Sequence, residues 1–62
     1  MNRETILAMD PNIFLSLVNM NLRDNYSSLE KLCEDWDVDC EEIESKLNSI
    51  GYEYIIELNQ FK

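Results

Sequence analysis

Most of the chain carries apolar residues at helical spacing, and the first long segment of this kind begins after Asp10. Aspartate often caps the N-terminus of a helix, and the proline that follows suits the first helical position. We therefore predict a helix from Pro11 to Asp24. Residues 1–9 show no strong pattern, and we expect them to form a loose lead-in to a single domain over residues 10–62.

The apolar residues of this first helix are more than one buried stripe requires. They cover an arc of roughly 220°, whereas a helix on one core needs a stripe only a little wider than about 100°. Either Ile6, Leu7 or the C-terminal segment covers the excess, or a second copy of the chain does. We predict the second arrangement, a homodimer in which the interface residues are Phe14, Leu15, Val18 and Leu22.

A second helix follows a capping signal. Ser27 and Glu30 form the S-x-x-E pattern of a capping box, which predicts a helix from about Ser28 to Trp36. Its apolar residues share one helix face: Leu29, Leu32, Cys33 and Trp36. Trp36 is the largest of them, and we expect it at the centre of the core.

A third helix shows the same kind of signal. Asp39 and Glu42 form a D-x-x-E box, which predicts a helix from about Cys40 to Ile50 with Asp39 as its cap. Gly51 suits the left-handed residue that ends many helices. The segment YEYIIELNQF is rich in aromatic and β-branched residues, which predicts a short hairpin, although no Asn-Gly or Asp-Gly pair places its turn. The fold class expected is mainly α, with three helices in a helix-turn-helix-like arrangement and a C-terminal β-hairpin.

The aspartates in EDWDVDCEE alternate like the first ligands of a calcium-binding loop. Counted from Asp35, the sixth position holds Cys40 where glycine is needed, and the twelfth holds Lys46 where a bidentate glutamate is needed. Both diagnostic positions fail. We interpret Asp35 as a helix residue, Asp37 as part of a turn and Asp39 as a cap, and we expect no metal site.

The segment from Ser28 to Tyr52 resembles the helix-turn-helix of bacterial winged-helix regulators. Val38 stands at the apolar position of the turn, and later core positions match Ile43, Leu47 and Ile50. The resemblance implies a fold and leaves DNA binding open. The face that would meet DNA offers only acids and small polar residues, namely Glu41, Glu42, Glu44, Ser45, Asn48 and Ser49. Such a face repels phosphates.

The composition and charge of the chain argue against several classes of partner and of chemical site. The formal net charge is −8, from five Lys and Arg against thirteen Asp and Glu, which disfavours nucleic acid and anionic membranes as partners. The sequence has no histidine, the commonest general base and metal ligand. Two cysteines make no disulfide framework. We expect Cys33 to be a small core residue, Cys40 to be an unreactive thiol, and the protein to be cytoplasmic, with no cofactor and no catalytic residue.

The chain as a whole resembles a small bacterial family of unknown function, numbered four-two-five-zero in the domain-of-unknown-function series. The resemblance rests on the pieces DP, VN, LRD, YSSLEKLCED, IGYEY and NQF, in that order, between Asp10 and Phe61. It implies a compact helical domain with no assigned activity. We therefore expect a non-enzymatic, acidic protein–protein interaction module. The alternatives are a helix-turn-helix DNA-binding regulator and an acidic mimic of nucleic acid.

Overall fold

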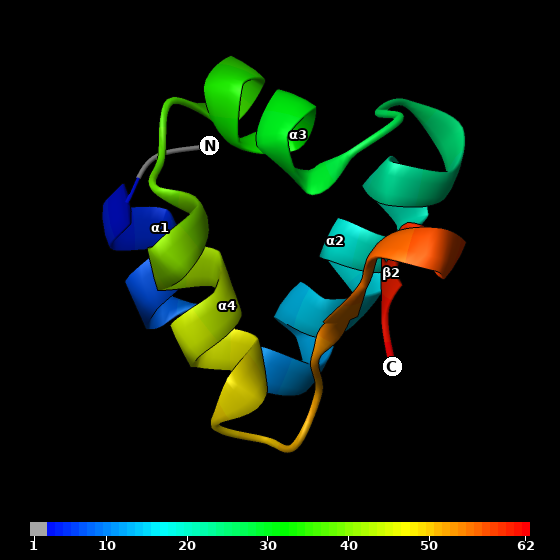
Figure 1. Cartoon of the computed structure of the whole chain (residues 1–62). Coiled ribbons are helices and arrows are strands. Elements are labelled where there is room, and N and C mark those ends of the chain that lie inside the picture. The colour runs from blue at the N-terminus through cyan, green and yellow to red at the C-terminus, as the bar shows by residue number, and fades with distance from the viewer. Residues whose placement is uncertain (1–2) are drawn as a thin grey trace.

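The computed structural model describes residues 3–62 as four helices followed by a β-hairpin (Figure 1). The elements are α1 (Arg3–Ala8), α2 (Pro11–Asp24), α3 (Leu29–Trp36), α4 (Cys40–Asn48), β1 (Tyr54–Ile55), the 3-10 turn η1 (Ile56–Leu58) and β2 (Gln60–Phe61). In the view of Figure 1, α3 crosses the top, and α4 and the hairpin lie on opposite sides. Helix α2 packs against all three. The mainly helical fold class with a C-terminal hairpin is confirmed.

The expectation of a loose lead-in over residues 1–9 is wrong where the structure describes it, because residues 3–8 form helix α1. Ile6 is fully buried. Arg3 pairs with Glu42 at 2.7 Å, and the Lys46 ammonium lies 3.4 Å from the carbonyl oxygen of Leu7. Helix α1 therefore packs beside α4. A six-residue helix has too few positions for a visible period, which is why the pattern missed it.

Helix α2 has the predicted bounds and the predicted cap. The Asp10 carboxylate accepts hydrogen bonds from the backbone N–H groups of Asn12 at 2.8 Å and Ile13 at 3.2 Å. These are two of the donors that a helix N-terminus leaves without partners. The helix ends at Asp24, as expected.

The connection from α3 to α4 takes three residues. The cap of α3 is Ser28, one residue later than expected, and its hydroxyl accepts from the Lys31 N–H at 3.3 Å. Asp37 then takes a left-handed conformation with φ 56°, and the Val38 N–H donates to the Cys33 carbonyl at 3.1 Å. This is the Schellman pattern, which turns the chain sharply after a helix. Asp39 occupies the cap position of α4, without a side-chain bond to that helix.

The end of α4 also forms a Schellman motif, here with glycine as the left-handed residue. Gly51 has φ 88°, and the Tyr52 N–H donates to the Leu47 carbonyl at 3.1 Å. The regular helix stops at Asn48, two residues before the predicted end. The hairpin follows, with Tyr54 opposite Phe61 and Ile55 opposite Gln60. Its turn is η1, closed by Asn59 in a left-handed conformation at φ 51°.

The core gathers residues from all four helices and from β2: Ile6, Phe14, Val18, Leu22, Leu29, Leu32, Cys33, Ile43, Leu47 and Phe61. The placement of Trp36 at its centre is wrong. Trp36 is half-buried and packs at the edge of the core, because α3 ends there and the chain turns away. Phe61, the last apolar residue of the sequence, is buried instead, between the hairpin and α2.

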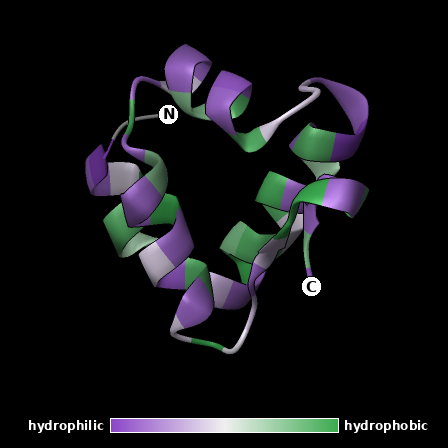
Figure 2. Cartoon of the chain, viewed as in Figure 1, coloured by the Kyte–Doolittle hydropathy of each residue, from purple (hydrophilic) through white to green (hydrophobic). Residues whose placement is uncertain are grey.

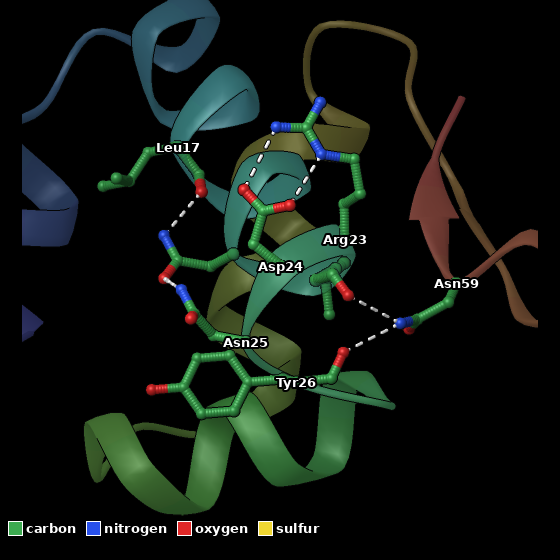
Figure 3. Close-up of polar contacts among 8 residues, drawn as sticks. Leu17, Arg23, Asp24, Asn25, Tyr26 and Asn59 are labelled. Atoms are coloured by element: carbon green, nitrogen blue, oxygen red, sulfur yellow. Dashed lines mark hydrogen bonds and ion pairs between the residues drawn. The ribbon is translucent and has the colours of Figure 1, made fainter.

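Two asparagine side chains attach the hairpin to α2 and to the loop that follows it. The Asn19 amide pairs with the backbone of Phe61 in both directions, at 3.0 and 2.8 Å. The Asn59 amide donates to the carbonyls of Leu22 and Tyr26, both at 3.0 Å (Figure 3). Sequence reasoning missed both roles. The only signal was the tolerance of asparagine for left-handed backbone at position 59.

Candidate functional site

The most distinctive surface of the protein is acidic and is built by α3, α4 and the turn between them. Between residues 30 and 44 there are eight carboxylates and one lysine, Lys31. Hydrophilic residues dominate the ribbon of α3 in Figure 2. We call this surface the acidic face, formed by Glu30, Glu34, Asp35, Asp37, Asp39, Glu41, Glu42 and Glu44.

Few of these carboxylates are paired within the described chain. Glu42 binds Arg3, and Asp35 accepts a 2.5 Å hydrogen bond from the Tyr26 hydroxyl. That bond raises the pKa of Tyr26, since losing the proton would place two anions together. Over residues 3–62, the other six carboxylates of the acidic face make no ion pair. Their charge is therefore directed at solvent.

The three alternating aspartates have the local positions that the sequence indicated. Asp35 lies in α3, Asp37 is the left-handed residue after it, and Asp39 precedes α4. Within residues 3–62, no three His, Cys, Asp or Glu side chains are grouped in a way that could hold a metal ion. The alternation thus follows from a helix, a turn and a second helix.

A groove of about 430 Å³ joins the acidic face to the hairpin. Its apolar lining comes from Leu29, Tyr54 and Ile56, and its charged lining comes from Glu30 and Glu44. Ile56 is 78% exposed, more than the other large apolar side chains of the described chain. We call this the hairpin groove; Ser28 and Cys40 complete its lining. Exposed apolar side chains next to charged ones are typical of protein-binding surfaces.

The Tyr54 hydroxyl fixes the geometry of this groove. It accepts from the Leu29 N–H at 3.2 Å and donates to the Asn59 Oδ1 at 2.6 Å. The Tyr54 ring packs on Phe61, with centroids 5.5 Å apart. The first turn of α3 and the hairpin are thus joined through one side chain, which makes the groove a preformed feature of the fold.

The two cysteines meet at the base of the α3–α4 turn. The Cys40 Sγ lies 2.6 Å from the Cys33 Sγ and 3.8 Å from the carbonyl oxygen of Leu29. Cys33 is buried, which confirms it as a core residue, and Cys40 is half-buried. Burial and the contact with Cys40 raise the pKa of the Cys33 thiol. The sequence did not predict this contact, because Cys33 and Cys40 are seven residues apart and lie on different helices.

Most of the α2 residues that were predicted to form a dimer interface are buried within the same chain. Three of the four predicted interface residues, Phe14, Val18 and Leu22, lie in the core of the same chain, each 2% exposed or less. Ile6 and Phe61 belong to the same cluster and cover much of the apolar arc. Leu15 is half-buried and lines a groove of about 640 Å³ between α2 and the hairpin, together with Met20 and Leu58.

Helix α4 occupies the place of a recognition helix in the expected arrangement. Its exposed side chains include Glu41, Ser45 and Asn48. Lys46, its one basic residue, donates to the Leu7 carbonyl of α1 at 3.4 Å and lies 5.9 Å from the ring centroid of Phe14 on α2. The helix therefore presents no free cation to a phosphate backbone.

The fold and these surfaces define a small four-helix domain with a C-terminal hairpin and an acidic helix pair. In the described part of the chain, each helix is too short or too polar to cross a lipid bilayer. The chain belongs to the family described as a domain of unknown function, DUF4250, which it matches over residues 8–61. No curated protein and no solved structure matches it significantly.

Proposed function

We propose that the protein is a non-enzymatic interaction module that binds a basic segment of a protein partner through the acidic face and the hairpin groove. The observation that carries this proposal is the position of Ile56, the most exposed large apolar side chain among residues 3–62, in a groove that Glu30 and Glu44 also line. An apolar contact of this kind gives affinity, and the surrounding charge selects the partner.

The chemistry of the partner follows from this lining. An apolar side chain of the partner would pack on Ile56, Leu29 and Tyr54, where a half-buried aromatic offers a large contact area. A lysine or arginine on either side would meet Glu30 or Glu44. The six unpaired carboxylates of the acidic face add long-range attraction, which speeds association with a cationic surface and weakens as salt is added.

The same features count against DNA as the partner. Duplex DNA carries about one negative charge per 1.7 Å of its axis, and binding requires cations that neutralise it. The negative charge is also compatible with a mimic of nucleic acid, which would be an interaction module whose basic partner is a DNA-binding protein. The identity of the captured partner distinguishes such a mimic from a module that binds another kind of basic protein.

Affinity capture with matched variants tests the proposal. The tagged protein and its Ile56→Ser and Glu44→Lys variants would be used as baits, and captured proteins identified by mass spectrometry and remeasured in pure form. Ile13→Ser is the matched control, since Ile13 is 63% exposed and does not line the groove. Glu4→Lys, on α1, controls for charge alone.

We expect both groove variants to weaken binding of the purified partner at least about tenfold and both controls to leave it unchanged. Surface changes of this kind alter the free energy of unfolding by about 0.5 kcal/mol or less, so weaker binding by a variant would not be caused by its unfolding. A partner that binds all four variants equally, or a robust gel shift of random duplex DNA at low salt, contradicts the proposal.

A further inference from the structure

We propose that Cys33 and Cys40 form a reversible redox site, in which an intramolecular disulfide links α3 to the first residue of α4. Their Sγ atoms are 2.6 Å apart, closer than unbonded sulfur atoms normally pack. A disulfide needs about 2.05 Å. The two sulfurs therefore lie about half an ångström from bonding distance.

The fold holds both sulfurs in place before any bond exists. Cys33 belongs to the core, and the carbonyl of the same residue accepts the Val38 N–H that closes the turn at 3.1 Å. Cys40 begins α4, with its Sγ also near the Leu29 carbonyl oxygen. The left-handed Asp37 sets the direction in which the chain returns. The geometry of the turn therefore raises the effective concentration of one thiol toward the other.

Solvent reaches the pair through a second cleft. This cleft has a volume of about 480 Å³, and both cysteines line it together with Glu30, Glu34, Asp37, Val38 and Asp39. A small-molecule disulfide can therefore approach Cys40, the more exposed of the two thiols. Cys33 lies deeper, and burial keeps it protonated at neutral pH.

The reaction is a double thiol–disulfide exchange with a small-molecule disulfide as the oxidant. The Cys40 thiolate attacks one sulfur of the oxidant, which releases one small thiolate and leaves a mixed disulfide on Cys40. The Cys33 sulfur then attacks the Cys40 sulfur, loses its proton to the departing thiolate and releases it as a thiol. In total, two protein thiols lose two protons and two electrons, and one oxidant molecule becomes two thiols.

The acidic lining predicts which oxidants react. Glu30, Glu34, Asp37 and Asp39 surround the entrance, so a cationic disulfide is concentrated there and an anionic one is repelled. We expect cystamine to oxidise the pair faster than glutathione disulfide does, by about tenfold at low salt. Added salt should reduce this ratio, since it screens exposed charges.

The decisive measurement compares the folded and unfolded chain. The reduced protein would be equilibrated in cystamine and cysteamine buffers, with and without urea, then quenched with acid, alkylated and weighed. A product lighter by two hydrogens and carrying no adduct is the internal disulfide. We expect the folded chain to form it at least about tenfold more favourably than the unfolded chain, and to keep its helical circular dichroism.

Single variants assign the two roles. Cys33→Ser should stop at a mixed disulfide on Cys40, while Cys40→Ser should acquire an adduct at least about tenfold more slowly. The comparison of folded and unfolded wild-type chain does not depend on these variants, in case Cys33→Ser fails to fold. Equal oxidation of the folded and unfolded chains, loss of structure on oxidation, or accumulation of mixed disulfides alone overturns the proposal.

Discussion

Replacing Asn59 tests whether one side chain holds the hairpin to the helices. Its amide nitrogen donates to two carbonyls, those of Leu22 and Tyr26, and its Oδ1 accepts from the Tyr54 hydroxyl. Its backbone is left-handed, at φ 51°. The Asn59→Ala variant removes three hydrogen bonds and forces a Cβ-bearing residue without a polar side chain into that conformation.

The magnitude follows from these contacts. Each hydrogen bond contributes about 1 kcal/mol net, and because the site is only partly buried, water replaces some of the loss. We take about 2 kcal/mol for the three bonds and add about 1 kcal/mol for the left-handed alanine. A chain of 62 residues has a total stability of only about 3–9 kcal/mol. Asn59→Ala should therefore lose about a third of it or more.

Urea denaturation followed by circular dichroism measures this loss. Asn59→Gly removes the same hydrogen bonds without the steric cost, so it should be about 1 kcal/mol less destabilised than Asn59→Ala. Asn25→Ala is the matched control, because the exposed Asn25 amide bonds only to Asn21. Its cost should stay below about 0.5 kcal/mol. If Asn59→Ala were as stable as wild type within that margin, the role assigned to Asn59 would be refuted.

Four further outcomes are expected. Leu32→Ala, which truncates a fully buried side chain, should cost about 2–5 kcal/mol in the same urea assay; a smaller change would contradict its place in the core. Millimolar calcium should leave the melting temperature unchanged, and a rise of several degrees would reveal a site for it. The predicted homodimer would have to use Leu15, and sedimentation equilibrium should show a dimer at micromolar concentration that Leu15→Glu dissociates; a monomer mass for wild type contradicts it. Folding raises the pKa of Cys33 above its ordinary 9.0 and of Tyr26 above its ordinary 10.0, so the stability that these two groups contribute to the reduced protein is full below about pH 9 and is lost as pH rises through the folded values; unfolding measured at pH 7 to 11 should show this loss, and Tyr26→Phe with Cys33→Ala should remove it.

Local signals predicted the elements whose ends are set by their own residues. Asp10 with Pro11 gave the start of α2, and Gly51 gave the left-handed residue after α4. These positions depend on backbone geometry within a few residues, which the sequence encodes directly. The core face of α3 was also readable, since Leu29, Leu32 and Cys33 are all buried.

The features that sequence reasoning missed depend on contacts between distant residues. The hairpin turn at Ile56–Leu58 contains two apolar residues and no turn signal, and Asn59, 33 and 37 positions away from its two carbonyl partners, holds it. The contact between the Cys33 and Cys40 thiols could not be predicted either, because it depends on the path that the chain takes between α3 and α4. For the same reason, Phe14, Val18 and Leu22 were placed at an interface, because their covering partners, Ile6 and Phe61, lie outside the segment.

The acids of the acidic face are not all explained by helix stability, and this gives a last prediction. Glu41 and Glu42 lie in the first turn of α4, where a negative charge is attracted to the positive end of the helix dipole and stabilises the helix. Glu34 lies near the C-terminus of α3, where its negative charge is repelled by the negative end of the helix dipole. The last turn of α3 has no basic residue to offset this repulsion. Glu34→Gln should therefore stabilise the protein by about 0.3–1 kcal/mol, and Glu41→Gln should destabilise it by a similar amount. If the acidic face binds a basic partner, both variants should nevertheless weaken binding, and salt should reduce the two losses together. Opposite effects on unfolding in urea with the same effect on affinity would separate the binding role of these acids from their structural role. A Glu34→Gln variant that is less stable than wild type would refute the argument.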